Sequence, residues 1–150
     1  MKKSVFESMV DKAFWGLEAK YGFKKTETTY VNRTCTVQFQ NMTTEVLLNY
    51  ELGNKPWLTI SDVHDAKNKT TLEWLLVELG KDEAPKPEQA FHPATIKEDE
   101  LDPILQKMAR EILDYGADLL KGNFALMPKL QDRARKYDLE CQRYLSIHKS

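Results

Sequence analysis

The chain has 150 residues and a formal net charge of −1 at pH 7, with 41% hydrophobic and 30% charged residues. This composition excludes a chain that is disordered over most of its length. The near-neutral charge excludes a general attraction to nucleic acid or to an anionic membrane. The length is that of one domain, so we expect a single domain over residues 1–150.

The cysteines and the N-terminal segment predict a cytoplasmic protein. Cys35 and Cys141 are the two cysteines, and they lie far apart in the sequence. A domain of this size has an adequate core without a disulfide, so reduced thiols are favoured over a disulfide bond. The first residues are not followed by the apolar run of a signal peptide. No segment approaches the ~18 consecutive apolar residues of a membrane span, so we expect no membrane partner.

An amphipathic helix is expected over residues 4–20. Ser4 and Glu7 have the spacing of a capping box, and apolar residues then recur at helical spacing. Gly22 follows where a left-handed residue commonly ends a helix.

From Thr26 the pattern alternates with a period of two and predicts four strands, at residues 26–31, 34–40, 43–51 and 57–63. Asn32 and Arg33 form a plausible tight turn, and residues 66–69 are expected to be a polar turn. The connections are too short for crossovers, so the strands should form an antiparallel meander.

Three helices are expected after the sheet, at residues 70–79, from about 99 to 120, and from about 128 to 147. Residues 81–97 carry three prolines and no periodic pattern, which predicts a loop. A run of strands followed by a run of helices predicts an α+β fold, with the helices packed mainly on one face of the sheet.

The sequence contains no phosphate-binding glycine loop, paired Cys-x-x-Cys or His-Glu-x-x-His motif, and we predict no cofactor. The best polar cluster is Asp62, His64 and Asp65, directly after the fourth strand. Carboxylate and imidazole groups could hold a divalent metal, which would support a small metal-dependent hydrolase. The favoured interpretation is an exposed turn in which an aspartate acts as a cap.

Two surface features point to a binding role. Trp57 and Leu47 should face away from the apolar side of the sheet, where large exposed side chains typically mark an interface. The alternative is that a C-terminal helix or a second subunit covers this face. Residues 78–102, which include Asp82 and Glu83, contain eight acidic and three basic residues, and this acidic segment suits a partner with a basic surface.

The last predicted helix is basic: residues 121–150 contain seven basic and three acidic residues. Arg133 and Lys136 lie one turn apart and could contact phosphates. A solvated helix face, partly neutralised by the acidic segment, is favoured over nucleic-acid binding. We therefore expect a protein partner or a homodimer.

The chain also resembles known proteins in plan. The opening helix ends in Tyr21-Gly22-Phe23, a meander follows, and a later helix closes with residues 118–124, Asp-Leu-Leu-Lys-Gly-Asn-Phe. This arrangement resembles small uncharacterised bacterial α+β proteins, some of which are similar to immunity proteins of polymorphic toxin systems. The resemblance implies a non-catalytic protein-binding domain, immunity-type in the special case, and it defines no functional residues.

Overall fold

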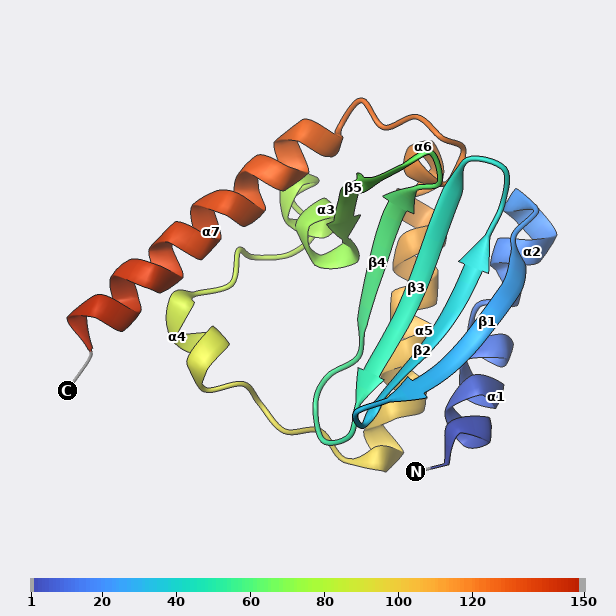
Figure 1. Cartoon of the computed structure of the whole chain (residues 1–150), viewed down its shortest axis with the longest axis horizontal. Coiled ribbons are helices and arrows are strands. Elements are labelled where there is room, and N and C mark those ends of the chain that lie inside the picture. Colours follow the sequence, from blue (N-terminus) through green and yellow to red (C-terminus); the bar gives the residue numbers. More distant parts are fainter. Residues whose placement is uncertain (1, 149–150) are drawn as a thin grey trace.

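A computed structural model describes residues 2–148 of the chain. They form one five-stranded antiparallel sheet with strands in chain order (Figure 1). The strands are β1 (Lys24–Val31), β2 (Thr34–Gln40), β3 (Thr44–Glu51), β4 (Trp57–Asp62) and β5 (Asp65–Thr71). The helices are α1 (Lys3–Ala13), α2 (Trp15–Tyr21), α3 (Leu72–Glu78), α4 (Pro87–Phe91), α5 (Glu98–Tyr115), α6 (Ala117–Leu120) and α7 (Met127–Ile147). The predicted α+β class, N-terminal helix and antiparallel meander are confirmed.

The prediction of four strands is wrong, because the segment expected to be a polar turn forms β5. This strand pairs antiparallel with β4, from Thr71 opposite Thr59 to Asp65 opposite Asp62. Thr70 is its one buried residue. A strand at the edge of a sheet can leave most of its side chains in water, so no apolar alternation marks β5 in the sequence. The following helix consequently begins at Leu72, two residues later than predicted.

The inner face of the sheet carries the core. Side chains of β2 and β3 alternate between buried and half-buried positions, as predicted, except that Asn49 on the outer face of β3 is also buried. In Figure 1, α5 lies behind the sheet and α1 lies beside it on the same side. The helix α5 buries Leu101, Leu105, Met108, Ala109 and Ile112. The inner face is therefore covered by helices, as the sequence predicted.

The opposite, outer face of the sheet is polar and crossed by no helix in Figure 1. Cross-strand hydrogen bonds link its side chains: Thr36 Oγ1 donates to Asn49 Oδ1 over 2.9 Å, and Gln38 Nε2 donates to Glu45 Oε2 over 3.0 Å. The C-terminal helix α7 contacts the edge strand β5. Gln131, Ala134 and Arg135 of α7 border a space with Thr59 and Thr71 of the outer face, so the suggested cover by a C-terminal helix is limited to the β4–β5 edge.

Two of the predicted helices are interrupted. The first breaks at Phe14, which is fully buried between α1 and α2. The later helix ends at Tyr115 and resumes as α6 after Gly116, and the expected loop 81–97 contains the short helix α4. Within the described residues, no helix combines the length and the apolar character needed to cross a membrane.

The side chain of Asn41 ties the β2–β3 turn to two helices. Its Oδ1 accepts the backbone N–H groups of Thr43 and Thr44 over 3.0 and 2.8 Å. Its Nδ2 donates to the carbonyl oxygens of Tyr21 and Leu120 over 3.0 and 3.1 Å. One amide group therefore holds the end of the sheet to the C-terminus of α2 and to α6.

The helix α7 is anchored at its N-terminal end and then leaves the rest of the molecule (Figure 1). Met127 and Leu130 are its buried residues, and Gln131 Nε2 donates to the carbonyl oxygens of Lys67 and Lys69 on β5 over 2.9 and 3.1 Å. Further along, the ring of Tyr144 stacks on Phe91 of α4, with centroids 5.7 Å apart. We call α4 and residues 137–147 of α7 the projecting pair.

Candidate functional site

A cleft of about 490 Å³ opens beside the first residues of β4. The strand β5 stops pairing at Thr71, opposite Thr59, so Trp57 and Leu58 pair with β3 alone. The chain turns there into α3, which leaves a space bounded by β4, α3 and α5. The lining residues are Lys55, Pro56, Trp57, Leu58, Thr71, Leu72, Glu73, Leu76, Asp82, Ile104, Lys107, Met108 and Glu111.

Trp57 forms the aromatic wall of this cleft. Its side chain is 39% exposed, whereas the next residue, Leu58, is 1% exposed and belongs to the core. Alternation along β4 therefore turns the two side chains to opposite faces of the sheet, as the sequence predicted. A partly exposed tryptophan beside apolar walls is the type of residue that dominates binding energy at protein interfaces.

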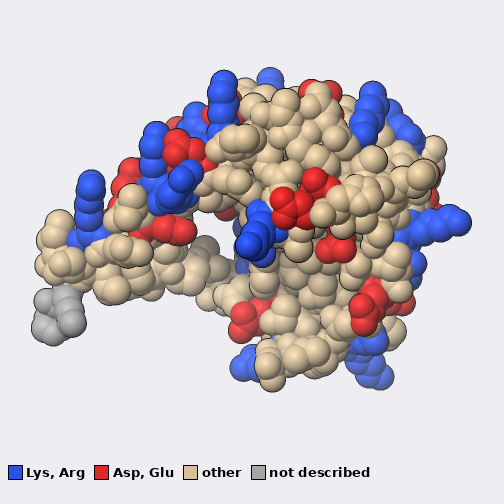
Figure 2. Space-filling model, turned by 45° about the horizontal axis from the view of Figure 1, so that its top comes forward, with Lys and Arg blue, Asp and Glu red and all other residues tan. Residues whose placement is uncertain are grey.

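The acidic segment reaches the same cleft. Asp82 lines it, and Asp82 and Glu73 also line an adjoining pocket of about 250 Å³ with Glu83 and Lys86. The two spaces share these carboxylates and form one groove. The structure therefore brings together Trp57 and Asp82, which the sequence marked separately. Figure 2 shows a hollow between the projecting pair and the rest of the molecule.

Charges of both signs surround the groove, and acidic groups prevail at the Asp82 end. Burial raises the pKa of the Glu73 carboxyl, Lys55 opposes part of this shift, and the negative charge of Asp82 adds to it. The adjoining pocket has three carboxylates, Glu73, Asp82 and Glu83, against one lysine, Lys86. This end of the groove is therefore suited to receive a cationic group.

Leu47 does not line the cleft. It is half-buried on the outer face, opposite Gln38 on β2 and Thr59 on β4. The sequence grouped Leu47 with Trp57 as one recognition face. The register keeps the two on that face as diagonal neighbours, because Trp57 pairs with Asn49, two residues after Leu47 on β3.

The predicted metal cluster forms the turn between β4 and β5. Asp62 Oδ1 accepts the backbone N–H of His64 over 2.8 Å, and Asp65 Oδ1 accepts that of Lys67 over 3.1 Å. Asn68 Nδ2 lies 3.5 Å from Asp62 Oδ2. Among residues 2–148, no group of three or more His, Cys, Asp or Glu side chains is arranged to hold a metal ion. The two aspartates act as turn caps here.

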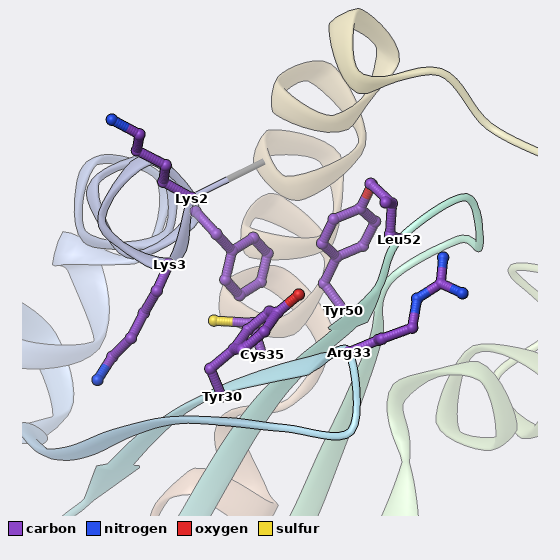
Figure 3. A pocket seen from close by; sticks show the side chains of 8 residues that line it. Lys2, Lys3, Tyr30, Arg33, Cys35, Tyr50 and Leu52 are labelled. Carbon is purple, nitrogen blue, oxygen red and sulfur yellow. The ribbon is translucent and has the colours of Figure 1, made fainter.

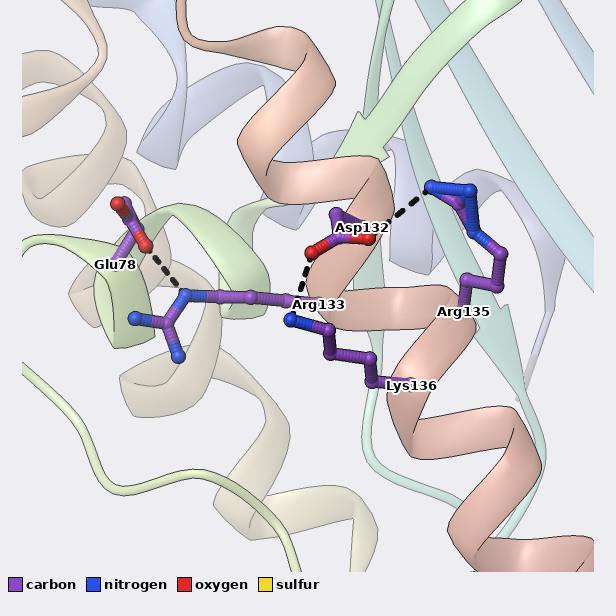
Figure 4. Close-up of polar contacts among 5 residues, drawn as sticks. All are labelled: Glu78, Asp132, Arg133, Arg135 and Lys136. Carbon is purple, nitrogen blue, oxygen red and sulfur yellow. Dashed lines mark hydrogen bonds and ion pairs between the residues drawn. The ribbon is translucent and has the colours of Figure 1, made fainter.

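Three basic residues of α7, Arg133, Arg135 and Lys136, form ion pairs (Figure 4). Arg133 Nε binds Glu78 of α3, which links the basic helix to the acidic segment. Asp132 pairs with Arg135 and Lys136 of its own helix, over 3.3 and 3.0 Å. The predicted partial neutralisation of this helix is therefore visible in the structure.

No protein-family model, curated protein or solved structure matches this chain. The candidate site accordingly depends on geometry alone. Sequence reasoning missed the contribution of α5 to the cleft. Ile104 and Met108 have the helical spacing of buried side chains, and Lys107 and Glu111 carry no pattern that sets them apart from other charges on a helix surface.

Proposed function

We propose that this chain is a non-catalytic protein-binding domain and that the groove beside Trp57 receives a segment of its partner. The observation that carries the proposal is the meeting of Trp57 and Asp82 in one groove. An apolar side chain of the partner would pack against Trp57, and a Lys or Arg would lie near Asp82 and Glu83. The chemistry of the groove therefore specifies a basic segment with an apolar anchor.

The proposal is tested by affinity capture from the native host with the wild-type chain and two tryptophan variants. Trp57→Ala removes the wall of the groove. Trp15→Ala is the matched control, because Trp15 is 67% exposed on α2 and does not line the groove. We expect one stoichiometric partner with the wild type and with Trp15→Ala, and at least about tenfold weaker binding with Trp57→Ala in a titration of the purified partner.

The acidic end of the groove is tested separately by the rate of association with the partner. The double variant Asp82→Asn, Glu83→Gln should slow association with the partner and reduce the salt dependence of the rate, because exposed charges act mainly through steering. Equal binding by wild type and Trp57→Ala, or no partner at either low or high salt, would overturn the proposal. Sedimentation of the purified chain measures whether it associates with itself. A homodimer in which the groove is occupied by a second copy would replace the proposed partner protein.

An immunity-type role is the special case in which the partner is a toxin. The resemblance in plan and the lack of a recognised catalytic motif support this case. It requires that the host encode a toxin beside the gene for this chain, and that co-expression protect the cell. If the Trp57→Ala variant still protects the cell from the toxin, the immunity role does not depend on the groove.

A further inference from the structure

A second pocket lies at the N-terminal end of α1 and shares no lining residue with the groove (Figure 3). Its inner wall consists of Phe6, Cys35 and Tyr50, and Tyr30 lies beside them. Its free volume is about 20 Å³, which is room for one water-sized group. Any larger ligand would therefore place a single atom inside and the rest at the mouth.

Tyr50 supplies an unused hydrogen-bond donor in this pocket. Tyr50 is only 3% exposed, and its ring stacks on Phe6 with centroids 5.4 Å apart. Its hydroxyl group is shielded from solvent and has no hydrogen-bond partner in the part of the chain that the structure describes. Buried hydroxyl groups are nearly always paired, so this one indicates a missing acceptor.

The residues that line the pocket carry only positive charges, and the carboxylate of Glu7 on α1 lies outside the lining. Lys2, Lys3 and Arg33 are among its lining residues, and none of the lining residues is acidic. These three cations form no ion pair with any residue of the described range 2–148. In Figure 3 the lysine side chains extend away from the rings, so each would turn back to contact a group at the mouth.

The start of α1 adds to this field. The helix has 11 residues, its N-cap residue Lys2 makes no side-chain cap, and its first turn contains no acidic residue. The free N–H groups at a helix N-terminus favour an anion, and lysines there are unfavourable without one. Arg33, in the β1–β2 turn with a φ of 69°, also lines the pocket.

We propose that this pocket binds a phosphate group, one oxygen of which accepts the hydrogen bond of Tyr50 while Lys2, Lys3 and Arg33 neutralise its charge. Phosphate suits the site because lysines bind it as point charges and arginine as a fork of donors. The size of the cavity admits one oxygen, and the other oxygens would lie at the mouth, where the side chains of Lys2, Lys3 and Arg33 would turn toward them.

The test is a thermal-unfolding titration with inorganic phosphate at constant ionic strength, with chloride as the reference anion. Phosphate should raise the midpoint of the wild-type chain in a saturable way. Tyr50→Phe keeps the ring stacked on Phe6 and removes the hydroxyl group, so the variant should fold and bind phosphate at least about tenfold more weakly, as expected for a hydrogen bond to a charged group. Arg33→Gln should also weaken binding, and Arg110→Gln, an equal charge change outside the pocket, should not.

Two further titrations identify the chemical class of the bound anion and the kind of molecule that carries it. Acetate replaces phosphate to test a carboxylate, and vesicles of phosphatidylcholine with phosphatidic acid test a lipid headgroup. If vesicles and inorganic phosphate both raise the unfolding midpoint, and Tyr50→Phe abolishes the effect of the vesicles, the site binds lipid phosphate. If inorganic phosphate alone raises the midpoint, the site binds soluble phosphate compounds. Acetate as effective as phosphate, no effect beyond that of chloride, or an equal effect on Tyr50→Phe would each overturn the proposal.

Discussion

The sheet with its covering helices and the projecting pair are stabilised by different means. On the inner face of the sheet, Val37, Val46, Leu48 and Ile60 are fully buried against helices. The projecting pair relies on ring contacts such as that between Phe91 and Tyr144, and α4 has no buried residue. Apolar burial provides most of the stabilisation of a fold, so the free energy of unfolding resides in the sheet and its helices. The projecting pair therefore contributes little to the free energy of unfolding.

The largest expected effect comes from a cavity in the core. Ile60→Ala removes a fully buried side chain from the inner face of β4 and should lower the free energy of unfolding by about 2–5 kcal/mol. Leu139→Ala is the matched control, because Leu139 is 49% exposed in the projecting pair, and it should change the free energy by less than ~0.5 kcal/mol. Urea unfolding measures both. A similar decrease in the free energy of unfolding for both variants would contradict the difference between the core and the projecting pair.

A smaller effect is expected at Asn41. The variant Asn41→Ala leaves two backbone N–H groups and two carbonyl groups without their side-chain partner, so the free energy of unfolding should fall by about 1–3 kcal/mol. Asn54→Ala serves as the control in the β3–β4 turn, where the side chain makes no hydrogen bond within the described structure. Equal denaturation midpoints for the two variants would show that the links to α2 and α6 contribute little.

The smallest global effect is expected in the projecting pair. Tyr144→Ala removes the stack on Phe91 and should leave the global free energy of unfolding within ~0.5 kcal/mol of wild type. Local opening of α4 should become easier by about 1 kcal/mol, because aromatic pairs contribute about that much. Amide hydrogen exchange resolves the two regions. Unchanged exchange in α4, or faster exchange throughout the sheet, would show that the regions are not energetically separate.

The contrast also explains which parts of the fold were predictable. The alternation of Cys35, Val37 and Phe39 was readable because β2 is central and one of its faces is buried. The strand β5 was not, because Lys67 and Lys69 are exposed and Thr70 alone is buried. The break at Phe14 was equally invisible, since an apolar residue there fits a continuous helix as well as it fits the junction of α1 and α2.

The candidate site was predictable residue by residue but not as a site. The alternation of β4 marked Trp57 as outward-facing, and charge counting marked Asp82 and Glu83. Their meeting depends on where β5 stops pairing and on how α3 and α5 pack, which are tertiary features that no local pattern encodes. The hydroxyl of Tyr50 was unmarked for the same reason, since the sequence indicates that a side chain is buried but not whether its polar atom finds a partner.

The side-chain amide of Gln131 determines how this sheet can associate with others. By donating to the carbonyl oxygens of Lys67 and Lys69, it occupies acceptors on the outer edge of β5. The unpaired part of β4 begins just after Pro56, which has no N–H group to offer a new strand. Fibre growth by strand pairing needs two open edges on every molecule, and here β1 is left as the open one. Edge pairing would therefore end at a closed pair of molecules rather than continue into a fibre.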